Sequence, residues 1–160
     1  MTVRLVKTLL VAAVAFHMTL VLFNNLADYG SNYLFVHHVL EMDTTLPGNN
    51  GMGRALHVHW EQLLFYDSII VWETVTMVLC WAGAWRMARA LRRPADAFVQ
   101  AKNTAVVGLA LNLLLWLVAF LGVGSEWFLM WQSKTWDGRD AAGRMFAVVG
   151  VVFLALLMKE

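Results

Sequence analysis

Residues 103–125 read NTAVVGLALNLLLWLVAFLGVGS and contain no charged side chain. A helix that crosses the hydrocarbon core of a bilayer needs about 20 consecutive, mostly apolar residues, so this stretch is long enough to span a membrane. Three further stretches have the same character, and only Asp67, Glu73 and Arg144 interrupt them: residues 9–27, 63–85 and 141–158. The pattern predicts an all-α fold, a membrane-embedded bundle of four helices.

The composition supports the same class. Of the 160 residues, 60% are hydrophobic and 14% are charged, whereas a soluble domain averages about 45–50% apolar and 25% charged residues. Four spans leave room only for connections, so residues 1–160 are expected to form one integral membrane domain. A net charge of +1 gives no basic surface of the kind that binds nucleic acid. The single cysteine, Cys80, excludes an internal disulfide and a C-x-x-C redox pair.

The distribution of lysine and arginine predicts the orientation. These residues stay preferentially on the cytoplasmic side of spanning helices. With both termini in the cytoplasm, the inner segments would hold eight of them and the outer segments four. The inner ones are Arg4, Lys7, Arg86, Arg89, Arg92, Arg93, Lys102 and Lys159, and the outer ones are Arg54, Lys134, Arg139 and Arg144. The connection 28–62 is then on the outer side, and its aromatic residues predict a partly helical segment on the membrane surface.

Polar residues recur on single faces of the predicted helices. At 100° per residue, Glu73 shares a face with Gln62, Tyr66, Thr76, Cys80 and His59, whereas Asp67 points elsewhere. By the same spacing, His17 shares a face of the first helix with Asn24 and Asp28. On the third helix, Asn112 shares a face with Ala105, Gly108, Ala119 and Glu126. Small residues in the third span, and Gly143, Ala147 and Gly150 in the fourth, predict close helix packing.

One intramembrane site is predicted from these faces. His17, Glu73 and Asn112 are expected to face one another, since ionisable groups inside a membrane often mark a binding site. They would form a proton relay, an ion path or a cofactor-binding site, or alternatively they only form hydrogen bonds that fix the helix register. A fourth span without polar residues in its interior argues against a transporter.

The histidines are all on the N-terminal side of residue 60. His37 and Glu41 are spaced i,i+4, as are His57 and Glu61, so each pair would share one helix face. Neutral imidazole and carboxylate groups suit transition metals. The candidate ligands are His37, His38, Glu41, His57, His59 and Glu61. Alternatively, the pairs are ordinary helix-surface contacts. A haem is not favoured, because His17 is the only histidine well inside a span.

The segment NYLFVHHVLEMDTTLPG, residues 32–48, is followed by GMGRA at 51–55 and IVWE at 70–73. With these pieces the chain resembles a bacterial family of predicted small integral membrane proteins of unknown function. The resemblance covers nearly the whole chain and implies four spans in the bacterial inner membrane. It implies no activity, cofactor or site residue.

Three functional hypotheses follow from the sequence. The leading one is an accessory or assembly subunit, packed among lipids against a larger membrane complex, such as a respiratory one, or against further copies of itself. The alternative is a metal-dependent or redox-linked enzyme with its site at the outer face. The third is a site for a lipid or a quinone between two spans, where the polar face that contains His17 meets the polar face that contains Glu73.

Overall fold

The computed structural model describes residues 1–159, which are largely helical and contain no strand. Four helical segments are long and apolar enough to cross a membrane: α1 (Thr2–Ala27), α3 (His59–Ala90), α4 (Ala95–Leu114) continued by the π-helix η2 (Leu115–Trp127), and α5 (Arg139–Leu157). The shorter helices are α2 (Tyr29–Glu41) and the 3₁₀ turns η1 (Met52–Arg54) and η3 (Met130–Gln132). The predicted four-span fold is confirmed, and the connection between the first two spans is partly helical, as predicted.

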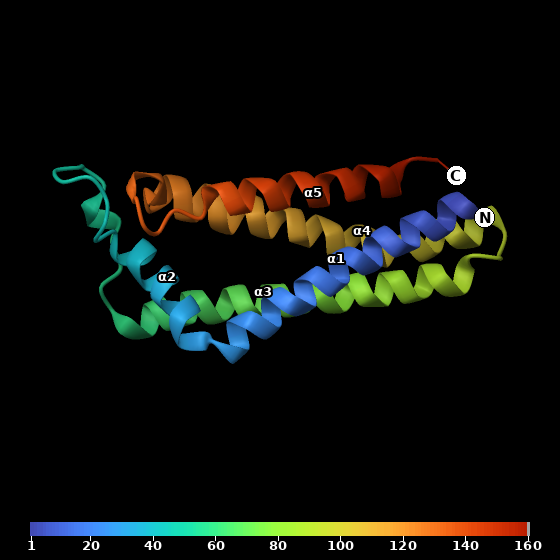
Figure 1. The fold of residues 1–160 in the computed structure, drawn as a ribbon, viewed down its shortest axis with the longest axis horizontal. Helices are drawn as coiled ribbons and strands as arrows, with labels where there is room; N and C mark the ends of the chain where they lie inside the picture. The colour runs from blue at the N-terminus through green and yellow to red at the C-terminus, as the bar shows by residue number, and fades with distance from the viewer. Residues whose placement is uncertain (160) are drawn as a thin grey trace.

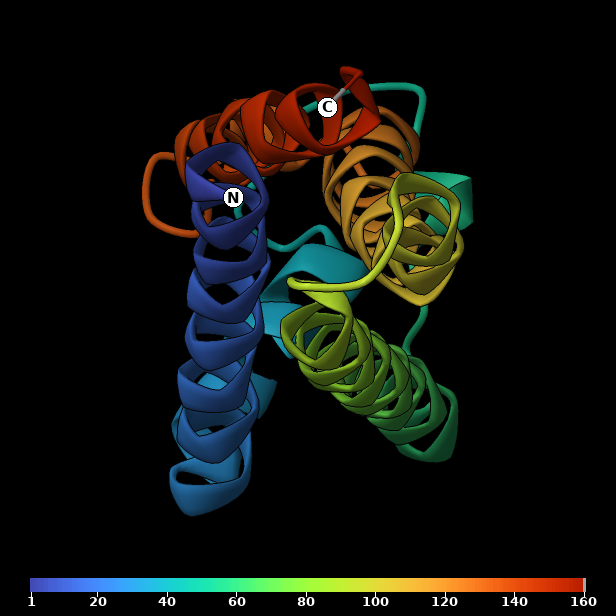
Figure 2. The ribbon, with the colours of Figure 1, turned by 90° about the vertical axis from the view of Figure 1, so that its right-hand side faces the viewer.

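The spans extend beyond their predicted bounds. The second begins at His59 and ends at Ala90, and the third begins at Ala95, because the helices continue into polar sequence that hydropathy does not detect. Both chain ends are at one end of the bundle, with α2 and the connections 42–58 and 128–138 at the other (Figure 1). We call these the terminal end and the loop end. Viewed along the bundle, α3 lies between α1 and α4 (Figure 2).

The closest helix contact joins α3 and α4 in the half near the terminal end. A Cβ atom built on Gly83 would lie 2.6 Å from the backbone N and Cα of Ala105, and one built on Gly108 would lie 2.9 Å from the backbone N of Cys80. The close packing predicted for the third span is therefore confirmed at Ala105 and Gly108, because small residues let two backbones approach.

The corresponding prediction for the fourth span is wrong. The core-facing residues of α5 are Ala142, Val149, Val152 and Leu156. Ala147 is exposed, and a Cβ atom on Gly143 would meet nothing within 4 Å. Branched and larger side chains therefore set the distance between α5 and its neighbours.

Toward the loop end, α3 and η2 move apart and α2 lies across the opening (Figure 1). An apolar pocket of about 30 Å³ remains beneath α2. Its lining comes from Val36 and Leu40 of α2, Phe65 and Ile69 of α3, and Ala119 and Phe120 of η2, among others. The apolar face of α2 thus fills most of the space that the diverging spans leave.

The π-helix η2 changes which residues of the third span face inward. A π-helix makes i→i+5 hydrogen bonds and therefore has a wider turn than an α-helix. The residues placed on one face by 100° spacing are buried as far as Asn112. Beyond it, Ala119 is only half-buried and Glu126 is exposed. The prediction for Glu126 is therefore wrong. At the start of η2, the Trp72 Nε1 atom donates to the Leu111 carbonyl at 3.1 Å.

Two buried lysines bind the C-terminal end of α5. Lys7 Nζ of α1 donates to the Met158 carbonyl at 2.5 Å, and Lys102 Nζ of α4 donates to the Leu156 carbonyl at 3.0 Å. The last carbonyls of a helix have no intrahelical partners and carry partial negative charge, so ammonium groups stabilise them. This contact joins α1, α4 and α5 at the terminal end.

A pair of glycine variants tests the α3–α4 contact. Gly83→Ala should destabilise the protein by about 1–3 kcal/mol, because the added methyl overlaps the Ala105 backbone and the helices must separate. Gly143→Ala meets no neighbour and should leave stability unchanged or raise it by up to about 1 kcal/mol, since alanine favours helix. Thermal unfolding in detergent measures both. Equal effects of the two substitutions would contradict the contact.

Candidate functional site

The polar groups at the loop end converge on Gln62, in the first turn of α3. Gln62 is 1% exposed. Its Nε2 atom donates to the Leu56 carbonyl at 2.7 Å and to Glu41 Oε1 at 3.2 Å. A carbonyl can only accept a hydrogen bond, so Leu56 fixes the orientation of the amide. The Oε1 atom of Gln62 is therefore directed at α2 as an acceptor.

Two side chains of α2 donate to this oxygen. His37 Nδ1 and the Tyr33 hydroxyl each lie 2.8 Å from Gln62 Oε1. Burial raises the pKa of Tyr33, and the charge of Glu41 raises it further, so the phenol keeps its proton and can donate it. His59 Nδ1 lies 2.9 Å from the same phenol oxygen and donates to it. In this network both imidazoles carry their proton on Nδ1.

The sequence of α2 explains this arrangement. Tyr33, His37 and Glu41 are spaced by four residues and share one face of the helix. The helix ends at Met42, which has left-handed backbone angles (φ 56°). The chain then returns, and Leu56 N donates to the Leu40 carbonyl at 2.9 Å. Leu56 thereby reaches the position where its own carbonyl accepts from Gln62.

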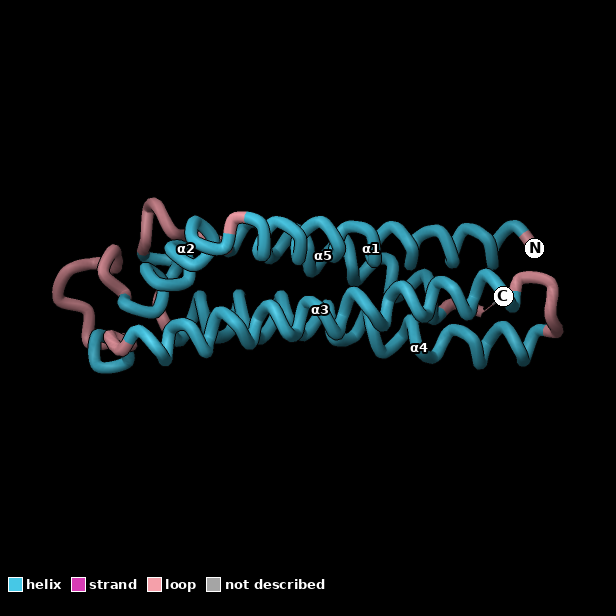
Figure 3. Tube along the Cα trace, turned by 90° about the horizontal axis from the view of Figure 1, so that it is seen from below, coloured by secondary structure: helices cyan, strands magenta, loops and turns pink. Residues whose placement is uncertain are grey.

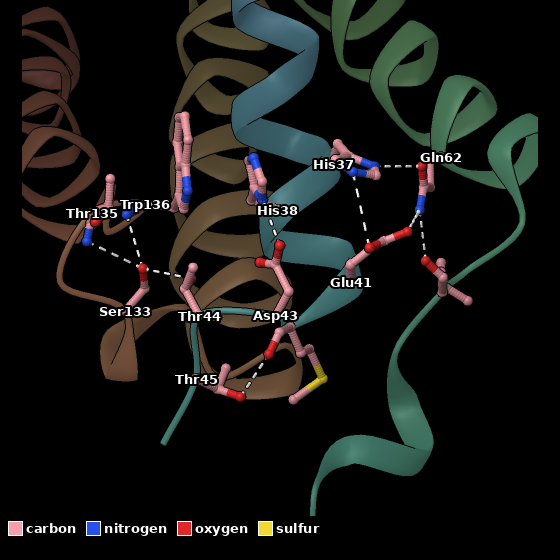
Figure 4. Close-up of polar contacts among 12 residues, drawn as sticks. His37, His38, Glu41, Asp43, Thr44, Thr45, Gln62, Ser133, Thr135 and Trp136 are labelled. Carbon is pink, nitrogen blue, oxygen red and sulfur yellow. Dashed lines mark hydrogen bonds and ion pairs between the residues drawn. The ribbon is translucent and has the colours of Figure 1, made fainter. Parts of the chain in front are cut away.

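His37 and Glu41 also approach each other directly. The His37 Nε2 and Glu41 Oε2 atoms are 3.9 Å apart, and both side chains are 28% exposed. Figure 4 shows that each side chain is held on its other side by Gln62. Both groups of the pair are therefore partly accessible to water.

His38 belongs to a different cluster. Its Nδ1 atom is 2.7 Å from Asp43 Oδ2, and its ring stacks on Trp136 with centroids 4.5 Å apart (Figure 4). Nearby, Thr44 Oγ1 donates to Ser133 Oγ at 2.8 Å. These contacts join the end of α2 to the connection between η2 and α5.

The structure therefore divides the six predicted metal ligands. His37, Glu41 and His59 belong to the Gln62 network, and His38 belongs to the Trp136 cluster. His57 is exposed and Glu61 half-buried. Over residues 1–159, no group of three or more His, Cys, Asp and Glu side chains is arranged to hold a metal ion. A site made of all six residues stays a prediction.

Inside the bundle, the partner of Glu73 is Asn25. Glu73 is 1% exposed, and its Oε2 atom accepts from Asn25 Nδ2 at 2.7 Å. The Tyr66 hydroxyl donates to the Asn25 carbonyl at 3.2 Å. Asn24 and Asp28, which the sequence grouped with His17, are exposed instead, so the face predicted for the first helix is wrong.

A signal for Asn25 was present in the sequence. Val11, Ala15, Met18 and Leu22 are buried, and their alternating spacing of four and three residues continues to Asn25. The faces predicted around Glu73 agree better with the structure. Gln62, Tyr66, Thr76 and Cys80 are all buried with it, although His59 is exposed.

The three predicted intramembrane residues have separate surroundings. Asn112 is buried, and its Oδ1 atom accepts from Trp116 Nε1 at 2.7 Å. Three buried polar atoms have no hydrogen-bond partner within residues 1–159: His17 Nε2, Thr76 Oγ1 and Asn112 Nδ2. From the Gly83–Ala105 and Cys80–Gly108 contacts, the antiparallel register places Thr76 opposite Asn112. Over the same residues no hydrogen bond joins His17, Glu73 and Asn112 to one another.

Asp67 shows the contrasting environment for an acid on α3. It is exposed, and its Oδ1 atom accepts from the Tyr29 hydroxyl at 2.7 Å. Burial raises the pKa of Tyr29 to about 12, with a further contribution from this hydrogen bond. Tyr29 therefore remains a neutral donor at physiological pH, and Asp67 points away from Glu73, as the helical spacing predicts.

The description "Predicted small integral membrane protein (DUF2165)" belongs to a family model that matches residues 3–159. The chain belongs to this family. Comparison with curated proteins and with solved structures gave no match. Membership of DUF2165 agrees with the resemblance carried by the segments 32–48, 51–55 and 70–73, and with the four apolar helices. The family description names no reaction, ligand or partner.

In this DUF2165 chain, two substitutions of Glu73 separate hydrogen bonding from charge. Glu73→Gln keeps an oxygen that accepts from Asn25, so stability in detergent should change little. Glu73→Ala leaves the half-buried Asn25 amide without its acceptor, which costs about 1–3 kcal/mol. Thermal unfolding of both variants measures the difference. If the glutamine variant is as unstable as the alanine variant, the Asn25 bond is not the stabilising contact.

Proposed function

We propose that the protein acts by contact, as an accessory or assembly subunit of a larger membrane complex in the bacterial inner membrane. The observation that carries this proposal is an ordered connection at the loop end, residues 42–54, with exposed apolar side chains. It extends beyond the ends of the membrane-spanning helices (Figure 3). We call it the tip loop.

The tip loop is held by hydrogen bonds and by Met42, which is buried in an apolar cluster with Phe128 and Met130. Thr45 Oγ1 donates to the Met42 carbonyl at 2.7 Å, and Asn49 Nδ2 donates to the Leu46 carbonyl at 2.9 Å. Leu46 N donates to Gln132 Oε1 at 3.0 Å, which fastens the loop to η3. Gly48 has a φ of +77°, which permits the turn. The loop therefore has a fixed shape.

Two large apolar side chains of this loop are exposed. Leu46 is 53% and Met52 is 42% exposed. Trp60 and Trp127, also exposed, lie at the ends of α3 and η2, where tryptophan commonly marks the membrane interface. A loop beyond these tryptophans would face water rather than lipid. Exposed apolar groups on an ordered loop are typical of protein contact sites.

The charge distribution supports an orientation for this contact. The eight basic residues assigned to the cytoplasmic side lie toward the terminal end of the bundle, and the four others lie toward the loop end. By the preference of lysine and arginine for the cytoplasm, both termini would be cytoplasmic. The tip loop would then meet its partner on the outer side of the membrane.

The apolar pocket beneath α2 does not favour a lipid or quinone site at the loop end. The apolar pocket beneath α2 has a volume of about 30 Å³, whereas sites for small organic ligands usually measure about 300–1,000 Å³. A quinone ring or an acyl chain would require α2 to move away from α3 and η2. The tip loop needs no such rearrangement to meet a partner.

A double substitution tests the tip loop. Leu46→Ser with Met52→Ser removes the exposed apolar groups and the contacts that Met52 Sδ accepts from Thr45 and Asn49. It leaves the hydrogen bonds of Thr45 and Asn49 to backbone carbonyls, and that of Leu46 N to Gln132, in place. We expect the variant to fold with an unchanged unfolding midpoint and to lose the partner that purifies in fixed proportion with the wild type in mild detergent. Val58→Ser, an equally exposed change outside the loop, should retain that partner. A complex that survives the double substitution would contradict the proposal.

Cysteine labelling tests the orientation. In a Cys80→Ala background, Asn50→Cys places an exposed thiol in the tip loop, and Ala95→Cys places one at the first residue of α4, next to the connection between α3 and α4. In intact cells a membrane-impermeant maleimide should label position 50 only, whereas after lysis it should label both. Labelling of position 95 alone before lysis would show the reverse orientation.

A further inference from the structure

The His37–Glu41 pair presents two electron-pair donors to each other with no hydrogen bond between them. The Nδ1 proton of His37 is directed to Gln62 Oε1, so in the neutral imidazole Nε2 carries a lone pair. This atom faces Glu41 Oε2, another acceptor, across 3.9 Å. That separation is too long for a hydrogen bond. A cation between the two atoms would satisfy both.

Both side chains are oriented from behind by one buried residue. Gln62 accepts from His37 Nδ1 at 2.8 Å and donates to Glu41 Oε1 at 3.2 Å. Metal-binding histidines commonly donate their second nitrogen to an oxygen acceptor, and metal-binding carboxylates are likewise hydrogen-bonded. We infer that His37 Nε2 and Glu41 Oε2 form a two-ligand site for a divalent transition-metal ion such as Zn²⁺ or Cu²⁺, with Gln62 as the positioning residue.

The distance is close to what such an ion needs. Metal bonds of about 2.0–2.2 Å to nitrogen and oxygen put two tetrahedral ligand atoms about 3.4 Å apart. The pair would therefore have to close by about 0.5 Å, which small side-chain rotations provide. Both side chains are 28% exposed, so water can reach the ion and fill the remaining positions. His59 is not counted as a ligand, because its Nδ1 atom binds the Tyr33 hydroxyl and no contact joins its ring to His37 or Glu41 within residues 1–159.

The ordinary interpretation is an i,i+4 contact on a helix surface, which is worth a few tenths of a kcal/mol. Such a contact requires no partner on the far side of either group. In this protein a side chain that is 1% exposed binds both groups and is itself fixed by the Leu56 carbonyl. Neither ligand lies within the tip loop, so the substitutions of Leu46 and Met52 leave both ligands in place.

Metal titration of the full-length protein in detergent tests the inference. After removal of metal with a chelator, Zn²⁺ should bind with one ion per chain in calorimetry. Cu²⁺ should give an electron paramagnetic resonance spectrum with coupling to one imidazole nitrogen. Lower pH should weaken binding, because protons compete for the imidazole.

Substitutions identify the ligands. His37→Gln and Glu41→Gln should each lower the affinity at least about 10-fold, and Gln62→Leu should lower it about 10- to 100-fold, the range found for residues that orient metal ligands. His57→Ala is the matched control, since His57 is exposed and outside the network, and its affinity should equal that of the wild type. His38→Ala should also leave it unchanged.

Three results would overturn the inference. The first is the absence of stoichiometric binding, and the second is binding that survives His37→Gln. The third is binding lost in His57→Ala, which would identify an adventitious surface histidine. Circular dichroism and the unfolding midpoint of each variant show whether it is folded. Tyr33→Phe adds a milder change, because it removes one hydrogen bond to Gln62 and leaves both ligands in place, so its affinity should lie between those of the wild type and Gln62→Leu.

Discussion

The close approach of α3 and α4 governs the arrangement of the other elements. Gly83 and Gly108 bring the two backbones together near the terminal end, and the same helices separate toward the loop end. In lipid, no hydrophobic force drives helices together, so packing and hydrogen bonds must hold them. A tight contact in one half therefore leaves an opening in the other half that the chain itself must fill.

The helix α2 fills that opening with an apolar face and presents a polar face to the network around Gln62. Its apolar face, with Val36 and Leu40, covers the pocket between α3 and η2. Its polar face, with Tyr33 and His37, forms the network around Gln62. A helix that lies at the end of a bundle can do both, because one side meets the apolar ends of the spans and the other meets water. The polar groups are consequently concentrated where a partner or ion could reach them.

The sequence predicted the class of fold because membrane spans depend on length and hydropathy alone, as residues 103–125 show. Helical spacing also identified the buried face of α3, where Glu73 lies. It failed where geometry departs from an ideal α-helix, as at Glu126 in the π-helix, and where two faces of α1 were similarly polar. The Gln62 network could not be predicted, because it depends on how the tip loop returns Leu56 to α2. No local pattern encodes that return.

The lysines at the end of α5 have a consequence for biosynthesis. Lys7 lies in the first span and Lys102 in the third, but the carbonyls of Leu156 and Met158 that they bind follow at the end of the fourth. The contact that joins α1, α4 and α5 therefore cannot form until α5 has been synthesised. A chain interrupted before residue 156 would lack the contact that closes the bundle at its terminal end.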